Sequence, residues 1–285
     1  MQVWLNGRFC AADKAFVPVT DRGFLLGDAF FETMRAHKGK VAWLEAHMSR
    51  LHRHAERIAF PVDLLPRSKQ VEEIITKLSE SIQGMDAVVR LTVSRGAGDR
   101  GLLPPSAPAP TILITLSPFE PVDPTDGIKL FTSQKVRRNP YSITGSIKST
   151  NYLDNIVAKQ EAHENGAQDA VILSSDGQVA ETSIANLFGI AKDSLWTPAE
   201  DTGILGGLAR AHVLQWAQET GIKVTHDPKT PDELREFDAL FTANALQGLR
   251  IVDQVDGYVI GIPDRTFFAK LAQMVERNLC DGIEV

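Results

Sequence analysis

The sequence predicts an α+β protein of two domains, and three observations lead to this fold class. Segments with helical spacing of apolar residues stand beside segments rich in β-branched residues, which indicates both helices and strands. The chain has 285 residues, 43% hydrophobic and 23% charged, so it is long enough for two hydrophobic cores. The stretch 118–127 is dense in proline and other turn residues, which is typical of a linker. We therefore expect a domain at 1–119, a linker at 120–127 and a second domain at 128–285.

The first domain is predicted to contain a hairpin, two helices and two further strands. Asn6-Gly7 is a turn dipeptide between the apolar segments 3–5 and 8–10, which predicts the hairpin. Apolar residues at intervals of three and four predict the helices, and β-branched runs predict the strands. The helices span Leu44 to Ile58 and Val71 to Ile82, and the strands span 87–94 and 111–116.

The second domain is predicted to begin with a strand at 128–132, and the charge run 135–138 is expected on a surface loop. Asn151 is predicted to cap a helix that ends at Gly166. Asp176-Gly177 predicts a hairpin, because this dipeptide favours a two-residue turn. The remaining predicted elements are hairpin strands at 170–174 and 178–182, a strand at 186–190, and helices at 208–216, 231–236 and 264–279.

Composition narrows the class of partner. The net charge of -6 and the pI of about 5.7 argue against a nucleic-acid-binding protein, so a small-molecule substrate is expected. The first residues lack the pattern of a signal peptide, and no run of 18 apolar residues occurs. We therefore expect no membrane association and a cytoplasmic location.

No metal site is expected. Cys10 and Cys280 lie near opposite ends of the chain and form no CxxC motif. His47, His52 and His54 are close together, but no set of acidic partners accompanies them, so a solvated helix face is the preferred interpretation.

Lys148 and Glu181 suggest a particular cofactor. A lysine can form a Schiff base with an aldehyde, and a carboxylate can keep the ring nitrogen of pyridoxal phosphate protonated. Lys148 precedes a predicted helix, and Glu181 lies on a predicted strand. The glycine-rich turn at 203–207 leads into a helix, which is the arrangement that offers backbone amides to a phosphate.

Four motifs together resemble the class IV, fold type IV pyridoxal-phosphate enzymes. They are Asp21 to Glu32, Lys148 with the following Asn-Tyr-Leu, Glu181 running into Ala-Asn-Leu-Phe, and the loop Gly203 to Arg210. The similarity extends from the first hairpin to about residue 258. The resemblance implies a smaller N-terminal α/β domain and a larger C-terminal domain like a β-barrel. It also implies a homodimer whose sites form where the two domains meet.

The resemblance also assigns roles to single residues. Lys148 would bind the aldehyde and move the proton of the substrate, and Glu181 would pair with the ring nitrogen. Arg50 matches the phosphate-binding arginine of the family, although a surface arginine is the alternative. The other cofactor-binding positions implied are Tyr152, Gly207, Leu208, Ala209, Thr242 and Asn244.

One departure from the family pattern and one set of substrate-binding residues follow from the same resemblance. Ala209 stands where threonine is common in the family, so a hydroxyl contact to the phosphate is lost. Thr242 or Asn244 could replace that contact. The expected substrate-binding residues are Phe31, Arg95 and Arg100. The two arginines are expected there because a guanidinium suits a substrate carboxylate.

The reaction is predicted to be that of aminodeoxychorismate lyase, which eliminates pyruvate to leave 4-aminobenzoate. Segments 94–102 and 242–250 are similar to segments of that lyase. The alternative is an aminotransferase acting on D-amino acids, branched-chain amino acids or (R)-amines, because segment 148–153 also occurs in transaminases. A non-catalytic carrier would lack Lys148 or Glu181, and both are present.

Overall fold

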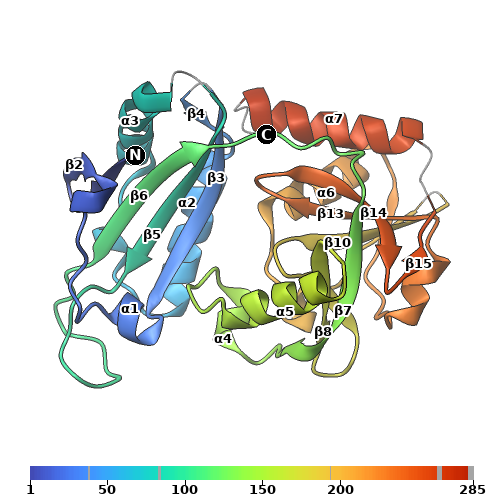
Figure 1. Cartoon of the computed structure of the whole chain (residues 1–285), viewed down its shortest axis with the longest axis horizontal. Helices are drawn as coiled ribbons and strands as arrows, with labels where there is room; N and C mark the ends of the chain where they lie inside the picture. Colours follow the sequence, from blue (N-terminus) through green and yellow to red (C-terminus); the bar gives the residue numbers. More distant parts are fainter. Residues whose placement is uncertain (38, 83–84, 193, 262–264, 282–285) are drawn as a thin grey trace. The chain divides into compact units, whose positions relative to one another are not determined.

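The computed structural model describes residues 1–37, 39–82, 85–192, 194–261 and 265–281, and the chain divides into two compact units (Figure 1). The first unit comprises 1–121, the short segment 147–151 and the end of the chain from Asn278. The second unit comprises 122–146 and 152–277. Lys148 therefore belongs to the first unit, although most of its sequence neighbours belong to the second.

The first unit is built on an antiparallel sheet with the strand order β2-β1-β6-β5-β3-β4. The predicted hairpin is confirmed, since Val3 pairs with Cys10 and Leu5 with Arg8. The predicted strand at 87–94 has the expected bounds, and its residues alternate between buried and half-buried positions up to Val93. The described strands are β1 (Gln2–Leu5), β2 (Arg8–Ala11), β3 (Ala29–His37), β4 (Lys40–Val41), β5 (Ala87–Ser94) and β6 (Thr111–Pro118).

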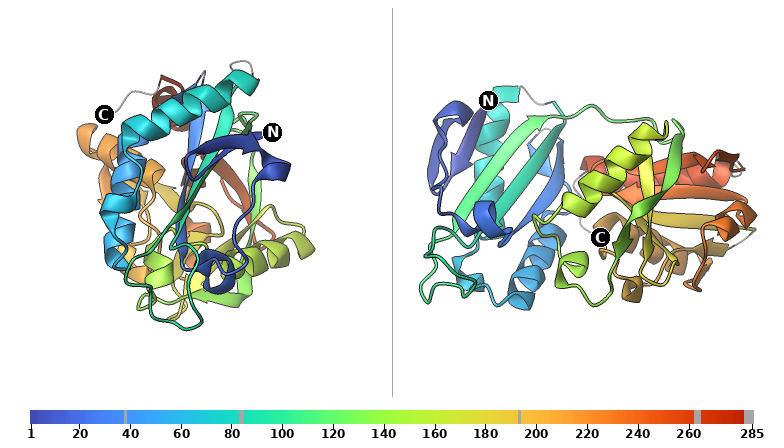
Figure 2. Two further views of the ribbon diagram at one scale, coloured as in Figure 1. Left: turned by 90° about the vertical axis from the view of Figure 1, so that its left-hand side faces the viewer. Right: turned by 60° about the horizontal axis from the view of Figure 1, so that its bottom comes forward.

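Two helices cover one face of this sheet, α2 (Leu44–Arg57) and α3 (Ser68–Ser79) (Figure 2). Both were predicted from their apolar stripes, which pack on β1, β3, β5 and β6 to form one core. The short helix α1 (Arg22–Leu26) was not predicted. Asp21 caps it by accepting hydrogen bonds from Gly23 N and Phe24 N, and Gly27 ends it in the left-handed conformation. The described 3₁₀ helices of this unit are Ala12–Lys14, Val62–Leu64 and Glu80–Ile82.

The second unit is built on a mixed sheet that curls, with the order β12-β11-β10-β13-β14-β7-β8-β9 and β15 beside β14 (Figure 2). Strand β7 runs parallel to β14 and β8, and β11 runs parallel to β12. The hairpin predicted around Asp176-Gly177 is confirmed, since β8 and β9 pair antiparallel. The described strands are β7 (Ile128–Arg138), β8 (Asp169–Ser174), β9 (Val179–Thr182), β10 (Asn186–Ala191), β11 (Ser194–Trp196), β12 (Lys223–Thr225), β13 (Ala239–Asn244), β14 (Gly248–Val255) and β15 (Tyr258–Val259).

Helices pack on this second sheet. Helix α5 lies on β7 and β8, and α6 on β13 and β12. Phe268 of α7 contacts Phe241 of β13, with their ring centroids 5.8 Å apart. The described helices are α4 (Ile143–Ser146), α5 (Leu153–Glu164), α6 (Leu208–Glu219) and α7 (Arg265–Asp281), with 3₁₀ helices at Glu200–Thr202 and Asp232–Glu236. Within the described ranges no helix is both long and apolar enough to cross a bilayer.

Three local predictions were wrong. The charge run 135–138 is part of β7 rather than a loop, because Val136 and Arg138 alternate with exposed neighbours and point inward. Asn151 does not cap α5. Its side-chain amide donates to Gly27 O at 3.0 Å instead, and α5 begins at Leu153 after Tyr152 without a side-chain cap.

The expected solvated face of α2 was also wrong for two histidines. His47 is fully buried and His54 is 7% exposed, because this helix faces both the apolar core and a buried carboxylate, Glu32. Only His52 of the three is exposed.

Candidate active site

The segment 147–151 runs beside the start of β3 and fixes the backbone at Lys148. Phe31 N donates to Lys148 O at 2.9 Å, and Thr150 N donates to Ala29 O at 2.9 Å. Ser149 forms an isolated antiparallel bridge with Phe30. Ile147 and Ser149 are buried on either side of the lysine, so its backbone is enclosed while its side chain is only half-buried.

The Lys148 side chain lies against an aromatic ring. Its Nζ is 4.6 Å from the centroid of Phe31, a residue that the sequence had placed in the substrate site. The guanidinium carbon of Arg90 lies 3.6 Å from the centroid of the same ring. Two cations therefore contact one phenyl group, a favourable arrangement for each because of the negative charge on the ring faces.

A buried cluster of charged side chains joins α2 to Glu32 of β3. Arg50 donates to both oxygens of Glu32, from Nε at 2.9 Å and from Nη2 at 2.6 Å, and His47 Nδ1 donates to Glu32 at 2.7 Å. Burial alone would raise the pKa of Glu32, but the charge of Arg50 and the hydrogen bonds from Arg50 and His47 hold it well below its usual range. The carboxylate is therefore ionised and orients Arg50, which is buried rather than on the surface.

Both buried histidines of α2 are neutral at physiological pH. Burial lowers the pKa of His47, and burial with the charge of Arg50 lowers the pKa of His54 to about 4. His54 Nδ1 lies 3.1 Å from the backbone nitrogen of Lys148, which donates to it. The lysine is thus bound by the same helix that carries Arg50.

In the second unit, Glu181 lies on β9 between two donors. Arg138 Nε donates to its Oε1 at 2.8 Å, and Leu205 N donates to its Oε2 at 3.2 Å. The Glu181 and Arg138 side chains are 8% and 9% exposed, so the pair is buried. Arg138 also donates to Asn155 Oδ1 at 3.3 Å, which links the carboxylate to α5.

The start of α6 follows directly after this carboxylate contact. Asn186 Nδ2 donates to Leu205 O at 2.9 Å, so Leu205 is held by Glu181 on one side and by Asn186 on the other. Gly207 is the N-cap of the helix, and a Cβ there would lie 2.1 Å from Asn186 Oδ1. The first amides of a helix have no partner inside it, and Leu208 and Ala209 supply two of them.

The other cofactor positions predicted from the sequence lie in the second unit. Thr242 is buried on β13 opposite Leu187. Asn244 Oδ1 accepts from Leu246 N at 2.9 Å and Gln247 N at 2.8 Å, so this oxygen holds a turn.

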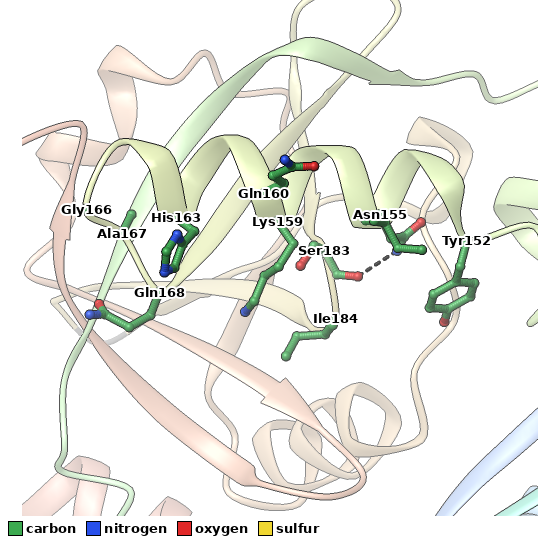
Figure 3. Close-up of a pocket in the computed structure, with 11 residues that line it drawn as sticks. Tyr152, Asn155, Lys159, Gln160, His163, Gly166, Ala167, Gln168, Ser183 and Ile184 are labelled. Carbon is green, nitrogen blue, oxygen red and sulfur yellow. Dashed lines mark hydrogen bonds between the residues drawn. The ribbon is translucent and has the colours of Figure 1, made fainter.

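Tyr152 borders a cavity of about 800 Å³ that extends along α5 (Figure 3). Ser183 and Ile184, which follow Glu181 in the chain, line it as well. Figure 3 shows the hydrogen bond that joins the two walls, from Asn155 Nδ2 to Ser183 O at 2.6 Å. Tyr152 thus lies near the segment that carries Glu181.

The two arginines predicted to bind substrate differ in their surroundings. Arg95 is 3% exposed and donates to Asp28, to Ile58 O at 2.9 Å and to Ala59 O at 3.2 Å. Because its guanidinium already donates to these groups, Arg95 holds two segments of the first unit together. We therefore do not expect Arg95 to contact a substrate. Arg100 is exposed. Its loop is held by Arg22, which donates to the carbonyls of Gly101 and Leu102.

Sequence reasoning missed Arg90, Arg138 and the inward orientation of His54. A signal existed for the first two, because both lie on strands with alternating burial. The partner of His54 comes from residue 148, and local periodicity contains no information about such a contact. Among the side chains that the structure describes, no group of three or more His, Cys, Asp or Glu residues could hold a metal ion.

Comparison with known proteins identifies the family. The family model of class IV amino-transferases matches residues 29–255. A Methanocaldococcus jannaschii protein that carries the provisional name branched-chain-amino-acid aminotransferase is 36% identical over 264 residues, covering 91% of this chain and 90% of the relative. The aminodeoxychorismate lyase of Bacillus subtilis is 31% identical over 247 residues, covering 85% of this chain and 80% of the lyase.

A solved structure shares the fold. A Mycobacterium tuberculosis protein, described as a hypothetical aminotransferase in its pyridoxal-phosphate-bound form, superposes with a TM-score of 0.85 at 21% identity, covering 99% of this chain and 100% of that chain. Both the family model and the relatives span most of this chain, and the expected two-domain α+β fold is confirmed. The chain therefore belongs to the class IV aminotransferase family, a family of pyridoxal-phosphate-dependent enzymes with fold type IV.

Proposed function

We propose that this enzyme is an aminotransferase in which Lys148 is the catalytic lysine. The observation that carries the proposal is the position of Lys148: its Nζ lies 4.6 Å from the Phe31 ring centroid, and its backbone N–H donates to His54 of α2, the helix that carries Arg50. A lysine with an enclosed backbone and a half-buried side chain suits covalent catalysis better than it suits a surface role.

The residues present fit pyridoxal 5′-phosphate by their chemistry. The cofactor needs an amine for its aldehyde, a carboxylate for its ring nitrogen, and cationic or amide donors for its phosphate. Lys148 supplies the amine and Glu181 the carboxylate, while Arg50 and the first amides of α6 are donors suited to phosphate. The absence of a Cβ at Gly207 lets the Asn186 side chain pack closely against the start of that helix.

The reaction requires proton transfer by the protein. When bound, the cofactor supplies an electron-withdrawing ring that stabilises negative charge at the α-carbon of an amino substrate. Lys148 Nζ would take the proton from that carbon and return a proton at a neighbouring position. The Phe31 ring keeps the lysine amine beside an apolar surface, which restricts the positions that the amine can adopt.

Glu181 would keep the ring nitrogen protonated. Arg138 and the Leu205 amide donate to this carboxylate. The same two contacts fix its orientation. Arg50 would bind the phosphate, and Glu32 holds the guanidinium in place for that contact.

Arg90 is the best candidate for binding a substrate carboxylate. Its guanidinium carbon lies 3.6 Å from the Phe31 centroid, so it shares with Lys148 the ring that we assign to the substrate site. A planar guanidinium binds carboxylates through paired hydrogen bonds. We therefore propose that Arg90 binds a carboxylate of an amino-acid or keto-acid substrate.

Two observations favour amino transfer over elimination of pyruvate. The segments that resembled the lyase have structural tasks here, since Arg95 fastens loops and Asn244 holds a turn. Arg95 and Asn244 therefore give no evidence of a contact with the substrate of the lyase. The relative with the aminotransferase name is also the more similar of the two compared above, at 36% against 31% identity. The lyase stays the second candidate because its relative spans 85% of this chain.

A panel of reactions decides between the two. Purified protein is incubated with D-alanine, L-leucine or (R)-1-phenylethylamine, each with 2-oxoglutarate or pyruvate, and separately with aminodeoxychorismate. Transfer of the amino group without formation of 4-aminobenzoate supports the proposal. Release of pyruvate and 4-aminobenzoate, with no amino transfer, would establish the lyase instead.

We also propose that the enzyme is a homodimer. Large apolar side chains are exposed on the first unit between residues 16 and 26, among them Phe16 and Phe24, each 78% exposed, and Val19, 80% exposed. Apolar patches of this kind are typical of interfaces. Light scattering should give twice the mass of the chain, and Phe24→Asp should shift the protein toward the monomer.

A further inference from the structure

We propose that His54 is a positioning residue for Lys148, and that it does so by accepting the backbone N–H of the lysine. The inference deepens the proposed function and rests on it, because it concerns the residue that would carry the cofactor. Its consequence is that one helix, α2, sets the position of both the lysine and Arg50.

The geometry places His54 at the backbone of the lysine. Its Nδ1 lies 3.1 Å from Lys148 N, within the range of a good hydrogen bond. Ile147 and Ser149, on either side of Lys148, are 5% and 4% exposed, so water has little access to this amide. Removing the acceptor would therefore leave a buried donor without a partner.

The position of His54 on α2 relates this hydrogen bond to Arg50. Arg50 and His54 are four residues apart, so they lie on the same face of the helix, one turn from each other. Glu32 anchors Arg50, and Lys148 anchors at His54. The remaining backbone contacts of the segment go to residues 27–31 rather than to α2. His54 thus gives a direct hydrogen bond between the lysine segment and the helix that carries the arginine.

The protonation state supports the contact. An N–H can donate only to an unprotonated ring nitrogen, so Nδ1 must carry the lone pair and Nε2 the hydrogen. Burial, together with the charges of Arg50, Arg53 and Arg57, lowers the pKa of His54 to about 4 against the opposing effect of Glu32. The acceptor form is therefore populated at neutral pH.

Two substitutions of His54 distinguish its role as a hydrogen-bond acceptor from its contribution to packing. In His54→Asn the amide oxygen can occupy the position of Nδ1, so the acceptor is retained. In His54→Leu the volume is similar but the acceptor is lost. The matched control is His52→Leu on the same helix, because His52 is exposed. His54→Ser, whose hydroxyl is too short to reach, replaces the leucine variant if that variant does not fold.

Two readouts are measured on the full chain. The first is the exchange rate of the Lys148 amide with solvent in cofactor-free protein carrying isotope-labelled lysine, which needs no catalysis. The second is the dissociation constant for pyridoxal 5′-phosphate, followed by visible absorbance. We expect His54→Leu to raise both by about tenfold, the effect of one lost hydrogen bond to a buried donor. We expect His54→Asn and His52→Leu to stay close to the unmodified chain.

Two results would overturn the inference. One is an unchanged Lys148 exchange rate and an unchanged dissociation constant in His54→Leu. The other is equal damage in His54→Leu and His54→Asn, because that outcome would mean that packing rather than the hydrogen bond matters. If the unmodified chain binds no pyridoxal 5′-phosphate, the proposed function fails, and the exchange rate alone still decides whether His54 holds the lysine.

Discussion

The buried pair of Glu32 and Arg50 leads to a quantitative prediction for Glu32→Gln. The Glu32 side chain is fully buried and accepts three hydrogen bonds, two from Arg50 and one from His47. Glutamine removes the negative charge and replaces one acceptor oxygen by a donor, which then faces another donor. Breaking a buried ion pair by changing one partner costs about 3–5 kcal/mol of unfolding free energy. We expect a loss in this range.

The pH dependence of this loss follows from the depressed pKa of Glu32. The unfolded carboxyl titrates near pH 4.5, and the folded one titrates well below that value. A depressed carboxyl pKa contributes stability that is complete above the unfolded pKa and is lost as the pH falls below it. The difference in unfolding free energy between the parent and Glu32→Gln should therefore be constant near neutral pH and shrink below about pH 4.5.

The assay is urea unfolding followed by circular dichroism. Glu56→Gln on α2 is the matched control, because Glu56 is an exposed acid on the same helix. The double variant Glu32→Leu with Arg50→Met should recover much of the loss, since apolar pairs of similar volume often replace buried ion pairs without penalty. A Glu32→Gln variant as stable as Glu56→Gln would refute the reasoning.

Three further predictions follow from the same contacts. The folded pKa of His54 is about 4, below its unfolded value of 6.5, so the stability linked to this group is complete above pH 6.5 and is lost as the pH falls toward 4. Between these pH values, the unfolding free energy of His54→Asn in urea should decline less steeply than that of the parent chain. An unchanged slope would contradict the assignment. Arg138→Met should cost about 3–5 kcal/mol in urea unfolding and weaken cofactor binding in an absorbance titration, because it leaves Glu181 buried without its guanidinium. The exposed Lys135→Met is its control, and equal effects of the two would refute a buried pair. Gly207→Ala should weaken cofactor binding and lower the melting temperature, because its Cβ would lie 2.1 Å from Asn186 Oδ1. The control Gly206→Ala should have little effect, because its Cβ would meet only the end of the Glu200 side chain, at 3.4 Å. A larger effect of Gly206→Ala than of Gly207→Ala would show that close packing at the start of α6 does not matter.

Helices and strands with a strong local signal were predictable, but strands β3, β4 and β11 to β15 were not predicted. The bounds of β5 match the predicted strand, and α2 covers the predicted apolar stripe. Strand β7 was underestimated because a run of charges was interpreted as surface. In a strand the side chains alternate, so Arg138 can point inward while Arg137 stays exposed.

The site was predictable only as far as its motifs. The resemblance identified Lys148, Glu181 and Arg50 as candidates, but it could not describe what holds them. Glu32 anchors Arg50 from a different element, Arg138 anchors Glu181, and His54 reaches Lys148 from a distant part of the chain. Such partners follow from tertiary packing, which residue spacing does not encode. The burial of His47 and His54 on α2 was missed for the same reason. From the sequence alone a histidine is expected on the solvated face of a helix, because its buried hydrogen-bond partner is not visible there.

The central claim is that Lys148 is the residue that binds the cofactor. The most direct measurement is borohydride reduction of the chain after incubation with pyridoxal 5′-phosphate, followed by peptide mass mapping. The account predicts a stable phosphopyridoxyl group on the peptide that contains Lys148, and no such group when Lys148→Ala is treated in the same way. Labelling of another lysine at the same level, or labelling that persists in Lys148→Ala, would contradict it.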